Sequence, residues 1–91
     1  MTGSTFIKYL KQYSDESNHS IQYSLYTNYV MFGISVNSVV YGFAQYYYGT
    51  RRITYYGYDY DIPVNTDGKI TYDIFKKSMD FLVEEFDRIY F

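Results

Sequence analysis

The chain has 91 residues and no cysteine, so we expect a single domain, residues 1–91, without disulfides or thiolate metal sites. Its formal net charge of −2 argues against a strongly basic nucleic-acid binder, because neutralising phosphates requires clustered Lys and Arg. No apolar run reaches transmembrane length and the first residues lack the pattern of a signal peptide, so we expect a cytoplasmic protein without membrane contact.

The first predicted element is a short N-terminal helix. Apolar residues recur at spacings of three and four between residues 6 and 13, as they do on the buried stripe of a helix. Ser4 is a suitable N-cap for it. The segment 15–20 is polar and turn-like, so we expect the helix to end there.

Between residues 20 and 60 the apolar pattern changes to an alternation with period two, in which β-branched and aromatic residues dominate. Short breaks, each suited to a hairpin turn, fall at Thr27-Asn28, Asn37-Ser38 and Gly49-Thr50. The pattern predicts an antiparallel meander of four strands. The first break is the weakest, and one long bulged strand from Ile21 to Ile34 would reduce the number to three.

The last predicted element is a C-terminal helix, which follows an irregular segment at residues 59–69. Thr71 is a suitable N-cap, and Asp73 lies in the first turn, where the helix dipole favours an anion. Apolar residues then recur in a rhythm of four and three, which indicates a buried stripe. The stripe consists of Phe75, Met79, Leu82, Phe86 and Ile89 or Tyr90.

Together these elements predict a two-layer α+β domain in which both helices cover one face of the antiparallel sheet. Gly33, Gly42 and Ala44 would let a helix approach that face closely. The other face would carry tyrosines toward solvent or a partner. The chain has 15 tyrosines, which cannot all be buried in so small a domain, and exposed tyrosines favour binding surfaces. A compositional bias of the genome would produce the same abundance.

Patterns for catalysis and metal binding are weak. His19 is the only histidine, and the sequence pairs it neither with a nucleophile nor with enough ligands to hold zinc. Residues 65–75 look like the second half of an EF-hand calcium loop, but Pro63 and Ile74 stand where acidic ligands are required. We therefore expect no enzyme activity, no metal and no cofactor.

Two surfaces are candidates for contact with a partner. The first interleaves tyrosines with arginines and could stack unpaired bases or bind an acidic protein. It consists of Tyr47, Arg51, Arg52 and Tyr55. The second is an acidic row beside the apolar stripe of the last helix, which could dock on a basic groove. It consists of Asp80, Glu84 and Asp87. For both candidates, a surface that contacts only solvent would show the same residue pattern.

In type, the chain resembles the small inhibitor proteins of phages and mobile elements, including the anti-CRISPR proteins. The matching features are a cysteine-free α+β chain, the acidic row and an aromatic strip from Tyr41 to Tyr60. The resemblance implies a non-enzymatic protein that blocks a protein or a protein–nucleic-acid complex. The alternative interpretation is a module that binds nucleic acid or a nucleotide through its tyrosines and Arg51/Arg52. Under both interpretations, the chain could also form a homodimer through the aromatic face or the edge of the sheet.

Overall fold

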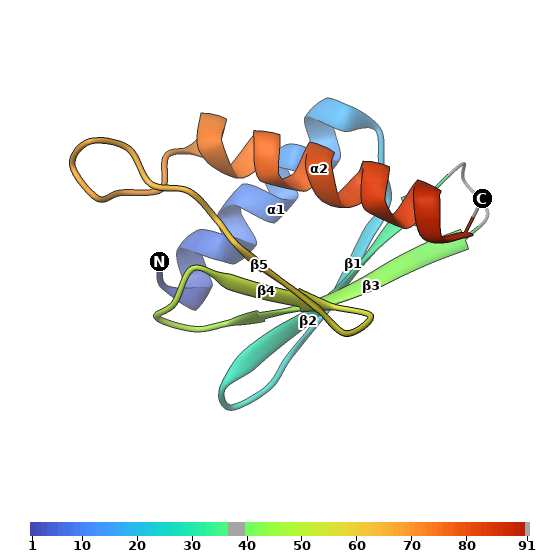
Figure 1. The fold of residues 1–91 in the computed structure, drawn as a ribbon, viewed down its shortest axis with the longest axis horizontal. Helices are drawn as coiled ribbons and strands as arrows, with labels where there is room; N and C mark the ends of the chain where they lie inside the picture. The colour runs from blue at the N-terminus through green and yellow to red at the C-terminus, as the bar shows by residue number, and fades with distance from the viewer. Residues whose placement is uncertain (37–39, 91) are drawn as a thin grey trace.

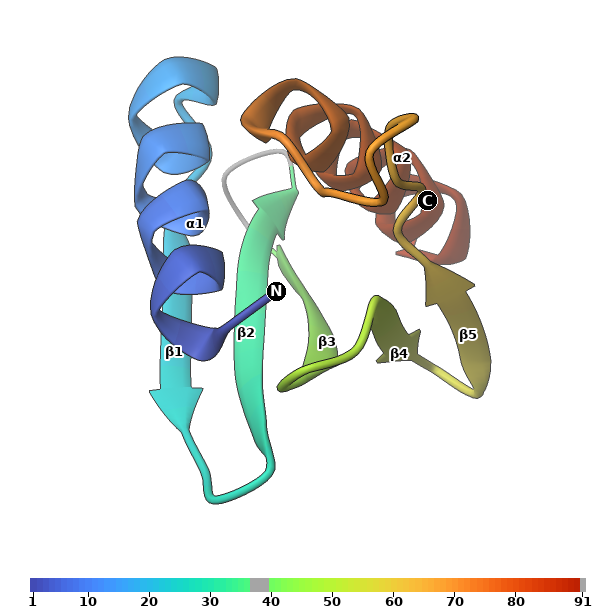
Figure 2. The ribbon, with the colours of Figure 1, turned by 90° about the vertical axis from the view of Figure 1, so that its left-hand side faces the viewer.

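The computed structural model describes residues 1–36 and 40–90 and arranges them in two layers. The elements are, in chain order, α1 (Gly3–Ser17), β1 (Ile21–Leu25), β2 (Tyr29–Val36), β3 (Val40–Tyr47), β4 (Arg52–Tyr55), β5 (Tyr58–Asp61) and α2 (Tyr72–Tyr90). Each strand pairs antiparallel with its neighbour in sequence, in the order β1-β2-β3-β4-β5 (Figure 1). Both helices lie on the same side of the sheet, with α1 alongside β1 (Figure 2). The predicted α+β fold is therefore confirmed.

The start and the end of α1 both differ from the prediction. The side chain of Thr2 accepts a hydrogen bond from the backbone N–H of Thr5 (3.2 Å), so Thr2 is the N-cap and Ser4 lies inside the first turn. The helix continues to Ser17, through residues that the sequence assigned to a turn. It ends where Asn18 adopts a left-handed conformation with φ of 60°.

Within the described residues the sheet has five strands, so the predicted number of three or four was wrong. The additional strand, β5, arises from a two-residue turn at Tyr56-Gly57 that returns the chain along β4. Both turn residues have positive φ, 46° and 85°, as a type I′ hairpin turn requires. Tyr55 and Tyr58 are directly opposite each other on the two sides of this turn.

The predicted turns elsewhere in the meander can be compared with the structure at two of the three breaks. The N–H of Tyr26 donates to the carbonyl oxygen of Tyr29 (2.9 Å) across Thr27-Asn28, so residues 21–34 form a hairpin and not one bulged strand. Gly49-Thr50 lies in the connection between β3 and β4, as predicted. The break at Asn37-Ser38 lies outside the described residues.

The hydrophobic core fills the space between the sheet and the helices. The stripe of α2 is confirmed as far as Phe86, because Phe75, Met79, Leu82 and Phe86 are all fully buried. The stripe does not extend further: Ile89 and Tyr90 are exposed, and Tyr90 packs edge-on against Tyr56. The remaining core side chains include Phe6, Leu10, Tyr13, Val30, Phe32, Ile34, Tyr46, Ile53, Tyr55 and Ile62.

α2 packs closely against a glycine of β3. A Cβ atom added to Gly42 would lie 2.1 Å from Cγ of Phe86, so only glycine leaves room for this ring. The register pairs Gly42 with Ile34 and Ala44 with Phe32, which puts both small residues on the helix side. Gly33 is paired with Phe43 and faces the other way, so its predicted role under a helix was wrong.

Candidate functional site

The sheet face that the helices leave uncovered, here called the open face, carries side chains in rows that run across the strands. The strand register defines these rows. The first row consists of Tyr26, Tyr29, Tyr47, Arg52 and Asp61. The second consists of Ser24, Met31, Gln45, Thr54 and Asp59. A third row begins with Gln22, Gly33 and Phe43.

Three tyrosine rings follow one another along the first row, and we call them the tyrosine ladder: Tyr26, Tyr29 and Tyr47. The rings of Tyr26 and Tyr29 stack with their centroids 4.9 Å apart, and the ring of Tyr29 lies 5.6 Å from that of Tyr47. The hydroxyl of Tyr47 donates to Oε1 of Gln45 (3.0 Å), which holds the last ring in place. The ladder is therefore an ordered aromatic surface with no helix above it.

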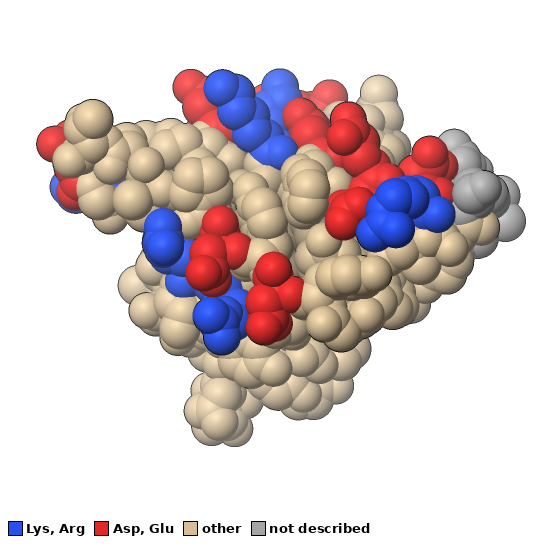
Figure 3. Space-filling model, viewed as in Figure 1, with Lys and Arg blue, Asp and Glu red and all other residues tan. Residues whose placement is uncertain are grey.

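Next to the ladder lies a depression of about 570 Å³, which contains both of the predicted arginines. It is lined by Tyr47, Thr50, Arg51, Arg52, Thr54, Asp59 and Asp61. Nε of Arg52 donates to Oδ1 of Asp61 (3.4 Å), and both side chains are about half exposed. Figure 3 shows basic and acidic side chains side by side over β4 and β5. The structure thus brings Tyr47, Arg51 and Arg52 together as predicted, but beside two carboxylates that compensate their charge.

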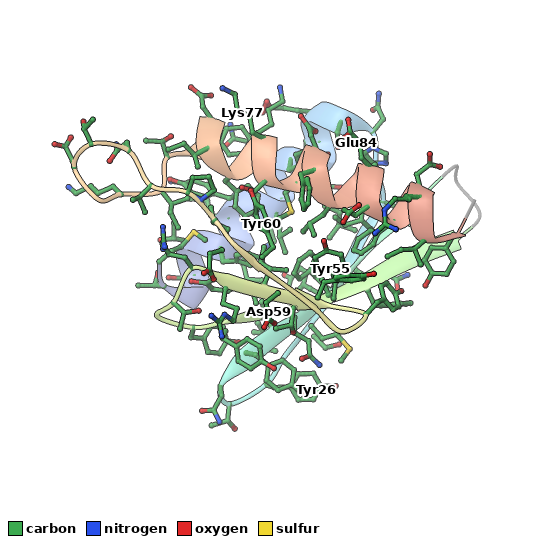
Figure 4. All side chains as sticks on the ribbon, in the orientation of Figure 1. Tyr26, Tyr55, Asp59, Tyr60, Lys77 and Glu84 are labelled. Atoms are coloured by element: carbon green, nitrogen blue, oxygen red, sulfur yellow. The ribbon has the colours of Figure 1, made fainter. Side chains whose placement is uncertain are left out.

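Tyr55, the fourth member of the predicted cluster, lies on the opposite face of the sheet. Its side chain is only 5% exposed, and its ring packs edge-on against Phe86 with centroids 6.0 Å apart. Its hydroxyl donates to Oε1 of Glu85 (2.8 Å). Burial, together with this hydrogen bond, raises the pKa of Tyr55 to about 12. In Figure 4 Tyr55 lies between the sheet and α2, so it offers no ring to a ligand on the open face.

The acidic row lies on α2, in the layer away from the open face, and Figure 4 shows its middle member, Glu84, on the side of α2 away from the sheet. All three of its members, Asp80, Glu84 and Asp87, are exposed. Oδ1 of Asp80 accepts a hydrogen bond from the hydroxyl of Tyr13 (2.8 Å), whose ring is fully buried. Burial and this hydrogen bond raise the pKa of Tyr13. The exposed Lys76 and Lys77 lie one turn before Asp80, so this face of α2 carries both signs of charge.

The weaker candidates for catalysis and metal binding, His19 and the loop in residues 65–75, form hydrogen bonds within the fold. Nδ1 of His19 lies 3.0 Å from the carbonyl oxygen of Ser35, which ties the connection after α1 to the end of β2. The side-chain oxygen of Asn65 accepts hydrogen bonds from the N–H groups of Asp67 (3.0 Å) and Lys69 (2.9 Å) and closes the loop upon itself. Within residues 1–36 and 40–90, no group of three or more His, Asp or Glu side chains is arranged to hold a metal ion. Neither described helix is long and apolar enough to cross a membrane.

Comparison with known proteins leaves the open face as the main guide to function. No family model matches the chain, and neither the curated proteins nor the solved structures include a significant match. The sequence did not single out Tyr26 and Tyr29 as candidates for partner contact, although a signal was present. The break at Thr27-Asn28 places these two residues opposite each other, with side chains directed away from the buried Val30.

Proposed function

We propose that this chain is a non-enzymatic binding protein that covers the surface of a macromolecular partner with its open face. The observation that carries the proposal is the tyrosine ladder, which continues into Met31 and Phe43. Phe43 is 48% exposed, and both residues line a hollow of about 230 Å³ in which an anchoring side chain of a partner could lie. Aromatic residues and methionine are enriched at protein interfaces. Rings that are already ordered also lose little conformational entropy on binding.

The chemistry of the open face favours a protein, alone or within a protein–nucleic-acid complex, as the partner. A small domain of this kind acts by occupying a surface, so we propose inhibition of a cytoplasmic partner, as in the phage inhibitors that the sequence resembles. The acidic row supports this contact less well than the open face does. Asp80 is engaged by Tyr13, and Lys77 lies next to it on the same helix.

The double variant Tyr26→Ser/Tyr47→Ser tests the proposal, because it removes both ends of the ladder. Its matched control is Tyr58→Ser/Tyr90→Ser, which removes two exposed tyrosines that lie on the helix side of the sheet. Each protein is used to capture partners from an extract of its source cell, and the captured proteins are quantified by mass spectrometry. We expect a partner that the wild type and the control retain and the ladder variant loses. A partner that the ladder variant retains would refute the open face as the contact.

Binding of single-stranded nucleic acid is the second candidate, because Tyr47 adjoins Arg52 in one row and Arg51 lines the same depression. A base could stack on the ring while the arginines meet phosphates. We rank it lower because a phosphate there would also meet Asp59 and Asp61.

Titration with a short single-stranded oligonucleotide at two salt concentrations separates the two candidates. Salt-sensitive binding by the wild type that Arg51→Ala/Arg52→Ala abolishes would favour nucleic acid over a protein partner. Lys76→Ala/Lys77→Ala, which removes two exposed cations from α2, is the matched control.

A further inference from the structure

The two edges of the sheet are protected to different degrees. Edge strands invite pairing with another chain unless charged residues or proline prevent it. β5 carries Asp59 and Asp61, and Pro63 follows shortly after it. β1, Ile21–Leu25, contains neither a charged residue nor proline. The β1 edge therefore lacks both of these protections against pairing with an additional strand.

The backbone of β1 directs hydrogen-bonding groups away from the sheet. The N–H of Tyr26 donates to the carbonyl oxygen of Tyr29, and the N–H of Ser35 donates to that of Ser20, both at 2.9 Å. In an antiparallel pair such bonded positions alternate, so the N–H and C=O groups of the even-numbered residues of β1 point toward β2. Ile21, Tyr23 and Leu25 thus direct their N–H and C=O groups outward, where the described part of the chain gives them no partner.

Two hollows lie along β1 on the side of the helices. One, of about 120 Å³, is lined by Leu10, Lys11, Ser14, Asp15, Ile21 and Tyr23. The other, of about 390 Å³, is lined by Gly3, Ser4, Ile7, Leu25 and Tyr48. Leu25 is the most exposed large hydrophobic residue of those described, at 64%, and Tyr23 is 39% exposed. A strip of exposed backbone thus runs beside two places for side chains.

We propose that the groove between α1 and the outer edge of β1, called the β1 groove, binds an extended segment of a partner protein as an additional strand. The segment's backbone pairs with Ile21, Tyr23 and Leu25, and its alternate side chains enter the two hollows. The larger hollow, beside Ile7 and Leu25, takes an apolar side chain. β1 carries no charge, and the two charged residues that line the smaller hollow, Lys11 and Asp15, have opposite signs, so the groove matches a segment without net charge. This site is separate from the open face and goes beyond the proposed function.

A second copy of the chain is the competing occupant, and the position of α1 argues against it. Figure 2 shows α1 alongside β1. Paired strands lie only about 4.8 Å apart, whereas packed helices need about 8–10 Å between their axes. Two copies joined through β1 would force their α1 helices together. A lone extended segment needs no such space.

The test uses a display library of random ten-residue peptides, selected against the wild-type protein, and a synthetic copy of the most enriched peptide. We expect the enriched peptides to carry apolar residues at alternate positions. Leu25→Lys should weaken binding of the synthetic peptide by about tenfold or more, because an apolar contact is lost. Val64→Lys, a change of another exposed aliphatic residue outside the groove, is the matched control and should leave affinity unchanged.

Hydrogen exchange provides the positional readout. When the peptide binds, the amides of Ile21, Tyr23 and Leu25 should become protected. The amides of Gln22 and Ser24 face β2 already and should not change. Protection on β5 in place of β1 would overturn the proposal.

Three further outcomes would also overturn it. These are the absence of enriched peptides, enrichment of a helical spacing of apolar residues, and a wild-type dimer in sedimentation equilibrium that Leu25→Lys dissociates. The last would identify a second copy as the occupant. None of these results depends on the ladder variant Tyr26→Ser/Tyr47→Ser, so failure of this inference and failure of the proposed function are distinguishable.

Discussion

Two buried tyrosines place their hydroxyl groups at the boundary of the core, where carboxylates of α2 accept hydrogen bonds from them. Tyr13 donates to Asp80 and Tyr55 donates to Glu85, each at 2.8 Å. A tyrosine can fill a core only when its hydroxyl finds such a partner. Part of the acidity of α2 is therefore structural. The sequence could not reveal this, because Tyr13 and Asp80 are 67 residues apart and on different elements.

The first prediction concerns Asp80, which the sequence places in an acidic row beside the apolar stripe of the last helix. In the structure, Asp80→Ala leaves the buried hydroxyl of Tyr13 without its acceptor. We expect a loss of about 1–3 kcal/mol in the free energy of unfolding. Glu84→Ala, on the same exposed face, should stay within about 0.5 kcal/mol of the wild type. Urea denaturation measures both, and equal losses would show that the Tyr13–Asp80 hydrogen bond does not stabilise the fold.

At the scale of elements, local patterns sufficed for α2 but not for the bounds of α1 or for the whole sheet. The apolar rhythm of α2 and its cap were predictable because both depend on neighbours in sequence, and the N–H of Ile74 does donate to Oγ1 of Thr71 (3.4 Å). The turn before β5 was missed because Tyr56 adopts a positive φ, which is uncommon for tyrosine. Gly33 was assigned to the wrong face because alternation within one strand does not give its register with the next.

The missed strand also explains what was missing from the candidate site. Tyr47, Arg51 and Arg52 were predictable because they are close in sequence. Asp59 and Asp61 come from β5, and only the pairing of β4 with β5 places them beside the arginines. Without that strand the cluster has a net positive charge. With it the charges are balanced, which makes the cluster less suited to binding phosphates.

The second prediction tests the contact between α2 and β3. Gly42→Ala places a methyl group where the ring of Phe86 lies, so α2 must move away from the sheet. We expect a loss of about 1–3 kcal/mol or more in the free energy of unfolding, as for other overpacked cores. Phe86→Ala alone should cost about 3–5 kcal/mol, because it leaves a cavity.

The double variant Gly42→Ala/Phe86→Ala provides the control for this prediction. The new methyl group would then enter the space that the ring vacates. Its loss should be smaller than the sum of the two single losses, since the two positions are in contact. Additive losses in urea denaturation would mean that the ring and the glycine do not constrain each other.

For the whole molecule, the residues that stabilise the fold differ from those that we propose to contact a partner. The helix side of the sheet holds the core, whereas the open face and the outer edge of β1 carry exposed residues that the core does not need. Substitutions at Tyr26, Tyr47 or Leu25 should therefore affect binding without unfolding the protein. Substitutions at the buried tyrosines should instead destabilise the fold.

The last prediction follows from the buried tyrosines as a group. Burial raises the pKa of Tyr46 to about 12, and the pKa of Tyr55 is raised to the same range. In an unfolded chain tyrosine titrates near 10. The folded state thus holds these protons more tightly than the unfolded state does. Their contribution to stability is complete below about pH 10 and is lost as the pH rises toward 12. We expect the free energy of unfolding to decrease over this interval.

Tyr46→Phe isolates one part of this effect. The ring of Tyr46 is fully buried and stacks on Phe6, and its hydroxyl donates to the carbonyl oxygen of Met1 (2.7 Å). The variant loses that hydrogen bond at neutral pH but has no proton to release at high pH. Between about pH 10 and pH 12 its free energy of unfolding should therefore fall by roughly 1–3 kcal/mol less than that of the wild type. Urea denaturation followed by circular dichroism at several pH values measures the two slopes. Parallel slopes would show that the hydroxyl of Tyr46 does not drive alkaline unfolding.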